Sequence, residues 1–302
     1  MKRTIYIETP CHLKSINNQL VICYSKIKGL ENYPDKTIPI EDVGMLILEH
    51  QQITISHYLL NCLVSSNVAV ITTSENHLPT GMFLPLDGHY LQSERFKSQI
   101  LATEPLKKQL WQQTVIAKIN NQASILKKWG CSDKVLIGLA KNVKSGDTNN
   151  NEATAAAYYW KNIFPQNWLF VRHREGYAPN NLLNYGYSIL RATMARAIVG
   201  AGLLPTLGIF HRNRYNAYCL ADDIMEPYRP FVDNIVRTII QNTSNVEILT
   251  KELKIELLKI TTLDVLLNDN KSPLMVAMQR TASSVAKCYS GEIRKISYPS
   301  CL

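Results

Sequence analysis

The chain has 302 residues, of which 46% are hydrophobic and 19% charged, so it can bury sizeable cores and is not disordered as a whole. Its 33 Lys and Arg against 24 Asp and Glu give a net charge of +9, which favours a polyanion such as nucleic acid as partner, or simply a generally basic protein. Arg191 and Arg196 interrupt the most apolar stretch, 189–210, so no membrane span is predicted, and the early Glu8 argues against a signal peptide. Seven cysteines without a CxxC pair argue against a disulfide framework and a zinc knuckle and fit a reducing cytoplasm.

The first 85 residues are predicted to form a small β-rich domain. They contain short segments rich in β-branched residues, separated by proline and glycine. One segment, 57–65, has apolar residues at helical spacing and predicts a lone helix. The predicted strands are 4–7, 19–24, 44–48, 52–55 and 67–72.

The pattern changes after the turn-type segment 85–88, and from Ser93 onward the apolar period lengthens to that of helices, while glycine and proline become rare. Thr103 followed by Glu104 predicts a helix start, and Gly202 is typical of a helix end. The predicted helices are 103–129, 152–164, 181–201, 217–242, 249–260 and 273–289, with a polar loop at 144–151. The predicted fold class is therefore α+β and multi-domain, with a β-rich domain at 1–85 and a larger all-α domain at 86–302.

Three carboxylates stand within five residues in the segment ADDIMEP, 221–227. Glu226 follows Asp223 by three residues and Asp222 by four, so the three share one face of a helix. Acids on one face repel each other unless a cation lies between them. The alternative is a solvated helix end, because Pro227 disfavours helical conformation at the residue before it.

His211 and Glu152 are two further candidates, and each also has an ordinary structural explanation. His211 ends an apolar run, as packed histidines do, and Glu152 opens a helix, where the helix dipole favours an acid. Together, carboxylates and one imidazole without a thiolate form a ligand set suited to Mg²⁺ or Mn²⁺ rather than structural zinc. A metal in such a set can polarise a scissile phosphate.

Directly after His211, Arg212 and Arg214 alternate with Asn213 and Tyr215. This pattern suits phosphate contact and base stacking, and it also suits an ordinary surface loop. The glycine pattern of a P-loop and the G-x-S-x-G and H-E-x-x-H motifs are absent from the sequence.

At these residues the sequence closely resembles the CRISPR-associated integrases, the endonucleases of spacer acquisition, and specifically their type II branch. The strongest block runs from 184 to 233 and contains the segments GIFHRNRYNAY and ADDIMEP. Further similar segments are KRTIYIETPCHLKSINNQLVI near the start, LPLDGHYLQSERFKSQ at the domain junction, NNNEATAAAYYW around Glu152 and SPLMVAMQRTASSVAKCYSGE near the end. The resemblance therefore covers nearly the whole chain.

The resemblance implies a site and a fold. Glu152, His211 and Glu226 match the family's metal ligands, and Asp223 matches a further acidic position of the same catalytic pocket. The metal is expected to be Mg²⁺ or Mn²⁺, and Arg212 and Arg214 are expected to contact DNA because they follow His211. The β-rich domain at 1–85 would make dimer or companion contacts, and the helical domain at 86–302 would be catalytic.

The implied reaction is transesterification, in which the 3′-hydroxyl of a prespacer attacks the repeat phosphodiester and a new spacer enters the CRISPR array. The expected partners are double-stranded DNA (prespacer and leader–repeat), a second copy of the chain, and a small companion protein completing a heterohexamer. The type II branch adds the RNA-guided effector nuclease, and the expected location is the prokaryotic cytoplasm, with no membrane partner. Two alternatives stay open, namely a structure-specific hydrolytic DNA nuclease and a catalytically silent DNA-binding assembly scaffold.

Overall fold

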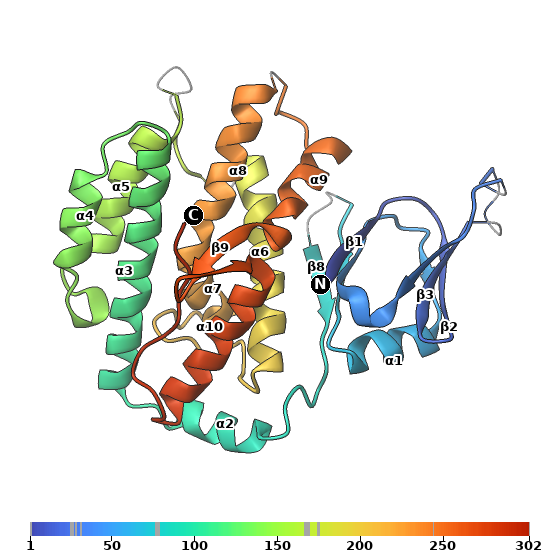
Figure 1. Cartoon of the computed structure of the whole chain (residues 1–302), viewed down its shortest axis with the longest axis horizontal. Coiled ribbons are helices and arrows are strands. Elements are labelled where there is room, and N and C mark those ends of the chain that lie inside the picture. Colours follow the sequence, from blue (N-terminus) through green and yellow to red (C-terminus); the bar gives the residue numbers. More distant parts are fainter. Residues whose placement is uncertain are drawn as a thin grey trace. The chain divides into compact units, whose positions relative to one another are not determined.

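The computed structural model describes residues 2–24, 27, 29–30, 32–75, 79–165, 170–173, 176–243 and 245–301. The chain divides into two compact units, Met1–Tyr90 and Leu91–Leu302, which are described separately (Figure 1). The sequence places the domain boundary a few residues earlier, at 85, and the roles predicted for the two domains stay predictions.

The described residues of the first unit form two four-stranded sheets and one α-helix. In one sheet the order is β1-β5-β7-β8, with β1, β5 and β7 parallel and β8 antiparallel to β7. In the other the order is β4-β3-β2-β6. The elements are β1 (Arg3–Ile7), β2 (His12–Ile16), β3 (Gln19–Cys23), β4 (Lys36–Pro39), the 3₁₀ turn η1 (Ile40–Asp42), β5 (Val43–Leu48), β6 (Thr54–Ile55), α1 (His57–Ser65), β7 (Ala69–Thr73) and β8 (Pro79–Phe83).

The core of the first unit is apolar and draws on both sheets and α1. Its central side chains are fully buried aliphatic residues, and burying each one contributes roughly 1.5–3 kcal/mol. They are Leu13 and Leu20 from one sheet, Val43, Leu46 and Val70 from the other, and Leu59 and Leu63 from α1. The hydrophobic effect therefore holds this unit together.

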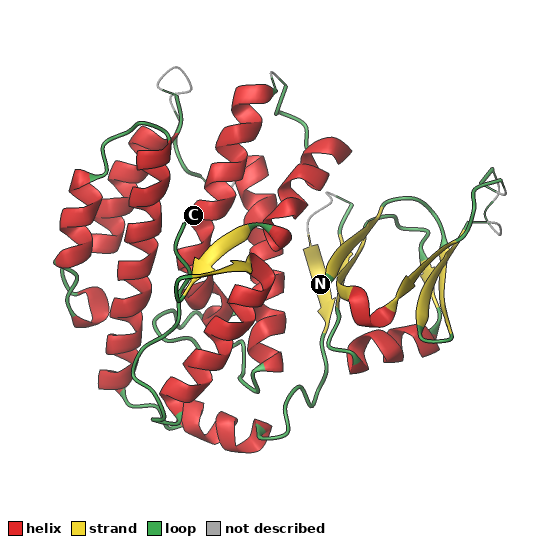
Figure 2. Cartoon of the chain, viewed as in Figure 1, coloured by secondary structure: helices red, strands yellow, loops and turns green. Residues whose placement is uncertain are grey.

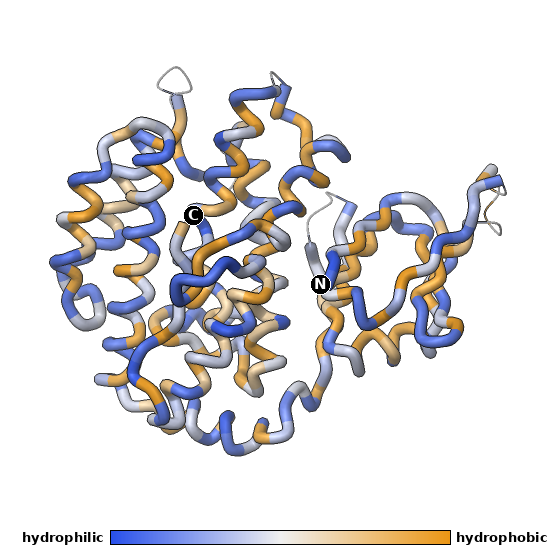
Figure 3. Tube along the Cα trace, in the orientation of Figure 1, coloured by the Kyte–Doolittle hydropathy of each residue, from blue (hydrophilic) through white to orange (hydrophobic). Residues whose placement is uncertain are grey.

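The second unit is mainly helical, with one β-hairpin among its helices (Figure 2). Hydrophobic and hydrophilic stretches alternate along these helices, as amphipathic packing requires (Figure 3). The helices are α2 (Gln92–Ile100), α3 (Glu104–Lys128), α4 (Lys134–Lys141), α5 (Asn151–Ile163), α6 (Asn180–Gly200), α7 (Cys219–Met225), α8 (Arg229–Asn242), α9 (Lys251–Leu258) and α10 (Leu274–Tyr289). The shorter elements are η2 (Ser145–Asp147), η4 (Glu226–Tyr228), η5 (Lys259–Thr262), β9 (Asp264–Leu267) and β10 (Asn270–Pro273).

The long helix α3 packs against α5, η4 and α8, so it contacts the elements that carry Glu152 and Glu226. Its start is fixed by Thr103, whose hydroxyl accepts the backbone N–H of Leu106 at 3.4 Å. Helix α6 is almost entirely buried along its middle part. Helix α3 packs with α4, α5 and α8, and α6 packs with α7, α8, α9 and α10, while α2 packs on α10.

The predicted α+β class is confirmed, and the second unit adds α2, α4 and one hairpin to the predicted elements. The segment 264–273 forms the hairpin β9–β10, whose turn residues Asn268 and Asp269 have φ of 50° and 61°. The predicted helix 217–242 is continuous except at η4, where Pro227 has no N–H to give to a helical hydrogen bond. Among the described helices, none combines the length and apolar composition that a membrane crossing needs.

Candidate active site

Glu152 and Glu226 come from different helices and meet at the ammonium group of Lys118. The Lys118 Nζ donates a hydrogen bond to Glu152 Oε1 at 2.6 Å and lies 2.7 Å from Glu226 Oε2. The Lys118 side chain is only 13% exposed, so three charged groups share a largely buried space. One positive charge therefore lies between the two predicted carboxylate ligands.

Glu152 is positioned by the first turn of α5. Both oxygens of Asp147 accept backbone N–H groups there, Oδ1 from Asn151 at 2.9 Å and Oδ2 from Glu152 at 3.0 Å. These N–H groups have no partner within the helix itself, so the Asp147 carboxylate fixes where the helix begins. The carboxylate of Asp147 thus determines the backbone position of Glu152.

Glu226 is buried at the junction of α7 and α8, between two cations. Its Oε1 lies 2.8 Å from the Nε of Arg229, while Oε2 faces Lys118. Burial by itself raises the pKa of Glu226, but the charges of Arg229 and Lys118 outweigh it and lower that pKa to about 2. The pKa of Lys118 is raised, because Glu226 and Glu152 more than offset the effect of its burial. Both groups are therefore charged at neutral pH.

Asp223 is fully buried and organises the segment that carries His211. Its Oδ2 accepts the backbone N–H of Phe210 at 2.8 Å, and its Oδ1 lies 2.5 Å from His211 Nδ1. The hydrogen bond to Asp223 raises the pKa of His211 against the effect of burial, and Glu226 and Glu152 act in the same direction. Because Nδ1 faces Asp223, Nε2 is the nitrogen that His211 can offer to a metal.

The irregular chain before His211 is held by a buried amide on α2. Gln99 donates to the carbonyl groups of Leu204 at 2.9 Å and Leu207 at 3.2 Å, and accepts the N–H of Leu204 at 2.9 Å. Phe210 stacks on Trp111 of α3 with ring centres 4.4 Å apart. The position of His211 thus depends on contacts with α2 and α3.

Gly208 lies where no side chain fits. A Cβ atom at this position would lie 2.4 Å from the carbonyl oxygen of His211 and 2.8 Å from Asp223 Oδ2. The close approach of the chain to Asp223 therefore requires glycine.

The remaining residues singled out in the sequence, Asp222, Arg212 and Arg214, make contacts with other partners than Lys118 and His211. Asp222 is held by Arg191, with nitrogen–oxygen distances of 2.7 and 3.0 Å, and by the amide of Asn216, so its oxygens are already used. Arg212 is exposed and pairs with Glu104 at 2.5 Å. The guanidinium of Arg214 lies 4.6 Å from the ring centre of the exposed Tyr215.

The described residues contain no cluster of three or more His, Cys, Asp or Glu close enough to hold a metal ion. The donor chemistry nevertheless fits a divalent cation. Two glutamates already share one positive charge, that of Lys118, and Glu226 Oε2 is buried without a well-aligned hydrogen bond. A metal that replaced the ammonium group would meet two carboxylates, with the oriented His211 nearby.

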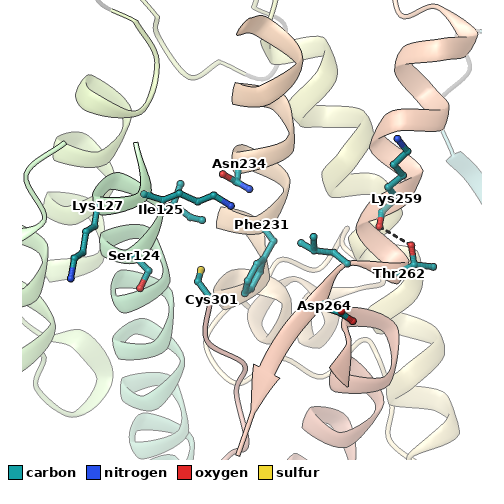
Figure 4. Close-up of a pocket in the computed structure, with 11 residues that line it drawn as sticks. Ser124, Ile125, Lys127, Phe231, Asn234, Lys259, Thr262, Asp264 and Cys301 are labelled. Carbon is teal, nitrogen blue, oxygen red and sulfur yellow. Dashed lines mark hydrogen bonds between the residues drawn. The ribbon is translucent and has the colours of Figure 1, made fainter. Parts of the chain in front are cut away.

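A separate hollow of about 960 Å³ lies in the second unit and contains none of the predicted site residues. Figure 4 shows the ammonium groups of Lys127 and Lys259 turned away from Cys301, and Lys259 pairs with Glu256 at 2.5 Å. The residues lining it are Ser124, Ile125, Lys127, Lys128, Phe231, Asn234, Lys259, Thr262, Leu263, Asp264 and Cys301. It is not the candidate site.

Sequence reasoning missed the residues of α3 that support the site. A polar stripe runs along one face of this helix at spacings of four and three residues, formed by Thr114, Lys118 and Asn121. This spacing is the sequence pattern that could have indicated them. The Asn121 amide donates to the carbonyl of Pro227, the residue after Glu226, at 2.7 Å. Lys118 and Asn121 thus both act on the segment that carries Glu226.

Comparison with known proteins identifies the family of this chain. The family model described as CRISPR associated protein Cas1 matches residues 5–252. A CRISPR-associated endonuclease Cas1 from Neisseria meningitidis serogroup C is 37% identical over 256 residues, which cover 84% of this chain and 83% of the relative.

Two solved structures share the fold. A casposase bound to its integration product has a TM-score of 0.77 at 19% identity, covering 98% of this chain and 92% of that one. A chain of a Cas6-RT-Cas1–Cas2 complex has a TM-score of 0.70 at 18% identity, covering 97% of this chain and 35% of that one. The matched length and the identity to the Neisseria relative show that the chain belongs to the CRISPR-associated Cas1 family.

Proposed function

We propose that this chain is a metal-dependent DNA endonuclease and integrase that inserts new spacers into a CRISPR array, in antiviral defence. The observation that carries the proposal is the shared cation position, with Glu152 and Glu226 at 2.6 and 2.7 Å from one ammonium nitrogen. Membership of the Cas1 family, with an endonuclease as a close relative, supports the same activity.

In this proposal Glu152, Glu226 and the Nε2 of His211 hold Mg²⁺ or Mn²⁺. The bound metal would polarise the scissile phosphate and stabilise the charge that develops during an in-line displacement. Asp223 keeps the imidazole in position by facing its Nδ1, and Arg229 keeps Glu226 ionised.

The nucleophile is the 3′-hydroxyl of a prespacer, so no covalent bond to the protein forms. The main task of the site is to align that hydroxyl with the phosphodiester at the leader–repeat junction. Lys118, displaced from the carboxylates, keeps its positive charge beside them, where it attracts the phosphate. Arg212 and Arg214 are exposed and follow His211 in the chain, and they bind the DNA backbone.

The proposal includes partners. Similarity to a chain of a Cas6-RT-Cas1–Cas2 complex supports a companion protein, and the type II resemblance adds the RNA-guided effector nuclease. Two copies of this chain would pair and assemble with the companion into a heterohexamer, using the unit Met1–Tyr90 for dimer or companion contacts. We place the complex in the prokaryotic cytoplasm.

The test is a joining reaction. The full-length protein is incubated with its companion, a labelled prespacer and a supercoiled plasmid carrying leader and repeat, with and without Mn²⁺ or Mg²⁺. Label that becomes covalently attached to the plasmid supports integration. Metal-dependent cleavage without joining would instead assign a hydrolytic nuclease.

The remaining candidate is a silent scaffold, which would bind both DNA molecules and neither join nor cut them. Such a result would contradict the proposed chemistry. It would leave only the family membership and the DNA-binding role.

A further inference from the structure

Each proposed carboxylate ligand is followed, seven residues later, by a member of a second buried cluster. Tyr159 follows Glu152 along α5, and Asp233 follows Glu226 along η4 and α8. Seven residues make about two helical turns, so each pair shares one face of its helix, separated by about 10 Å along the axis. Behind the carboxylate pair there is therefore a second pair on the same two helices.

Asp233 is the centre of this second cluster. Its Oδ2 accepts the hydroxyl of Tyr159 at 3.0 Å, and its Oδ1 accepts the hydroxyl of Tyr187 from α6. Asp233 and Tyr159 are 1% and 0% exposed, so these bonds form without competition from water. Hydrogen bonds in a site that excludes water are stronger than those exposed to solvent.

Arg229 connects the two clusters. Its Nε lies 2.8 Å from Glu226 Oε1, and its guanidinium carbon lies 4.6 Å from the ring centre of Tyr187. A shift of Tyr187 or Asp233 would therefore move the cation that holds Glu226.

We infer that Asp233 is a positioning residue that sets the separation of Glu152 and Glu226 through its hydrogen bond with Tyr159, and thereby sets the affinity for the metal. The inference rests on the proposed function. Lys118 links the two carboxylates only while no metal has taken its place. Once the ammonium group is displaced, the bond between Tyr159 and Asp233 still ties α5 to α8.

The test compares two neighbouring tyrosines in the full-length protein. Tyr159→Phe removes the hydroxyl that bonds Asp233, whereas Tyr158→Phe removes an exposed hydroxyl that donates to the carbonyl of Ser132 at 3.1 Å. Binding of Mn²⁺ alone is measured by calorimetry or by the loss of its free paramagnetic signal. We expect Tyr159→Phe to weaken Mn²⁺ binding about fivefold to tenfold, and Tyr158→Phe to leave it within about twofold of wild type.

Thermal unfolding of the same proteins separates positioning from stability. A folded Tyr159→Phe variant with a lower Tm and wild-type Mn²⁺ affinity would overturn the inference. If Tyr159→Phe does not fold, Asp233→Leu removes the acceptor of the same hydrogen bond and is held to the same criterion. A wild-type protein that binds no Mn²⁺ would overturn the proposed function as well, so the two failures are distinguishable.

Discussion

The two units bury different kinds of side chain. Among the described residues of the first unit, Glu49 and Thr73 are the buried polar side chains, and aliphatic residues fill its core. The second unit buries carboxylates and cations, among them Asp223, Glu226 and Asp233. Buried charges cost free energy unless they are paired, and paired charges of this kind are typical of functional sites. This difference supports the proposal that the chemistry lies in the second unit, because the buried charged groups there are the ones that a catalytic site needs.

The largest effect is expected at the carboxylate ligands. Glu152→Gln keeps the shape of the side chain and removes the charge, so we expect the joining rate to fall by about 10³-fold or more. Initial rates of prespacer joining in Mn²⁺ measure this. Glu256→Gln, at an exposed acid paired with Lys259, is the control. A Glu152→Gln rate within about tenfold of wild type would refute the assignment of the site.

A substitution in the core of the first unit should act on stability alone. Leu46 is fully buried in β5, so Leu46→Ala should lower the unfolding free energy of that unit by about 2–5 kcal/mol. Urea unfolding measures the loss, with Leu86→Ala, at a residue 94% exposed, as control. The contrast between the units fails if Leu46→Ala also changes the affinity for Mn²⁺.

Removing the ammonium group should strengthen metal binding. Lys118→Met leaves Glu152 and Glu226 without their shared cation, so Mn²⁺ no longer has to displace it, and we expect about tenfold tighter binding. The increase of Tm on adding Mn²⁺ should become larger. Lys107→Met, on the same helix beside Glu104, is the matched control. An unchanged or smaller increase of Tm would show that Lys118 does not occupy the metal position.

The pH dependence of stability should reveal the buried Asp233. Burial raises the pKa of Asp233 from 3.8 to about 7, although Tyr187, Tyr159 and Arg229 oppose the rise. The folded state therefore holds a proton that the unfolded state has lost, and stability falls as pH rises from about 4 to about 7, at most by about 1.4 kcal/mol per pH unit. The Asp233→Asn variant has no carboxyl group at this position, so its unfolding free energy lacks this dependence on pH. Unfolding free energies measured across that range should show wild type losing its advantage over the variant, and parallel curves would contradict this.

The smallest effect concerns the exposed arginines. Replacing Arg212 and Arg214 by alanine should reduce the slope of log affinity for DNA against log salt by about two, since each lost phosphate contact changes it by about 0.9. Binding titrations at several salt concentrations measure the slope. The control is the double variant Lys271→Ala and Arg280→Ala, which also removes two positive charges, from exposed positions on another part of the second unit. An equal reduction by both pairs would show a general charge effect rather than contacts beside His211.

Much of the fold could be predicted because local patterns determine it. Helix 57–65 is confirmed as α1, and the predicted start after Thr103 is confirmed as that of α3, since capping and apolar period act within the chain. The missed strands of the first unit are β2, β4 and β8. Strands β4 and β8 carry proline and lie at sheet edges, where the alternating pattern is weak, whereas β2 lies inside its sheet between β3 and β6.

The site was harder to predict. Motif similarity indicated Glu152, His211 and Glu226, and the structure brings the two glutamates together. Motif similarity could not indicate Lys118, which lies 34 residues before Glu152 on another helix. Lys118 is buried only because α3, α5 and η4 pack together. Asp223 was predicted as part of an acidic pocket, and its contact with His211 depends on the loop from 203 to 210, which has no regular pattern.

The space at Gly208 has a consequence for how the gene can vary. A single nucleotide change that adds one methyl group there would force His211 and Asp223 apart while leaving every acid, base and cation of the site in the sequence. A copy with that change would look intact by an inventory of its functional groups.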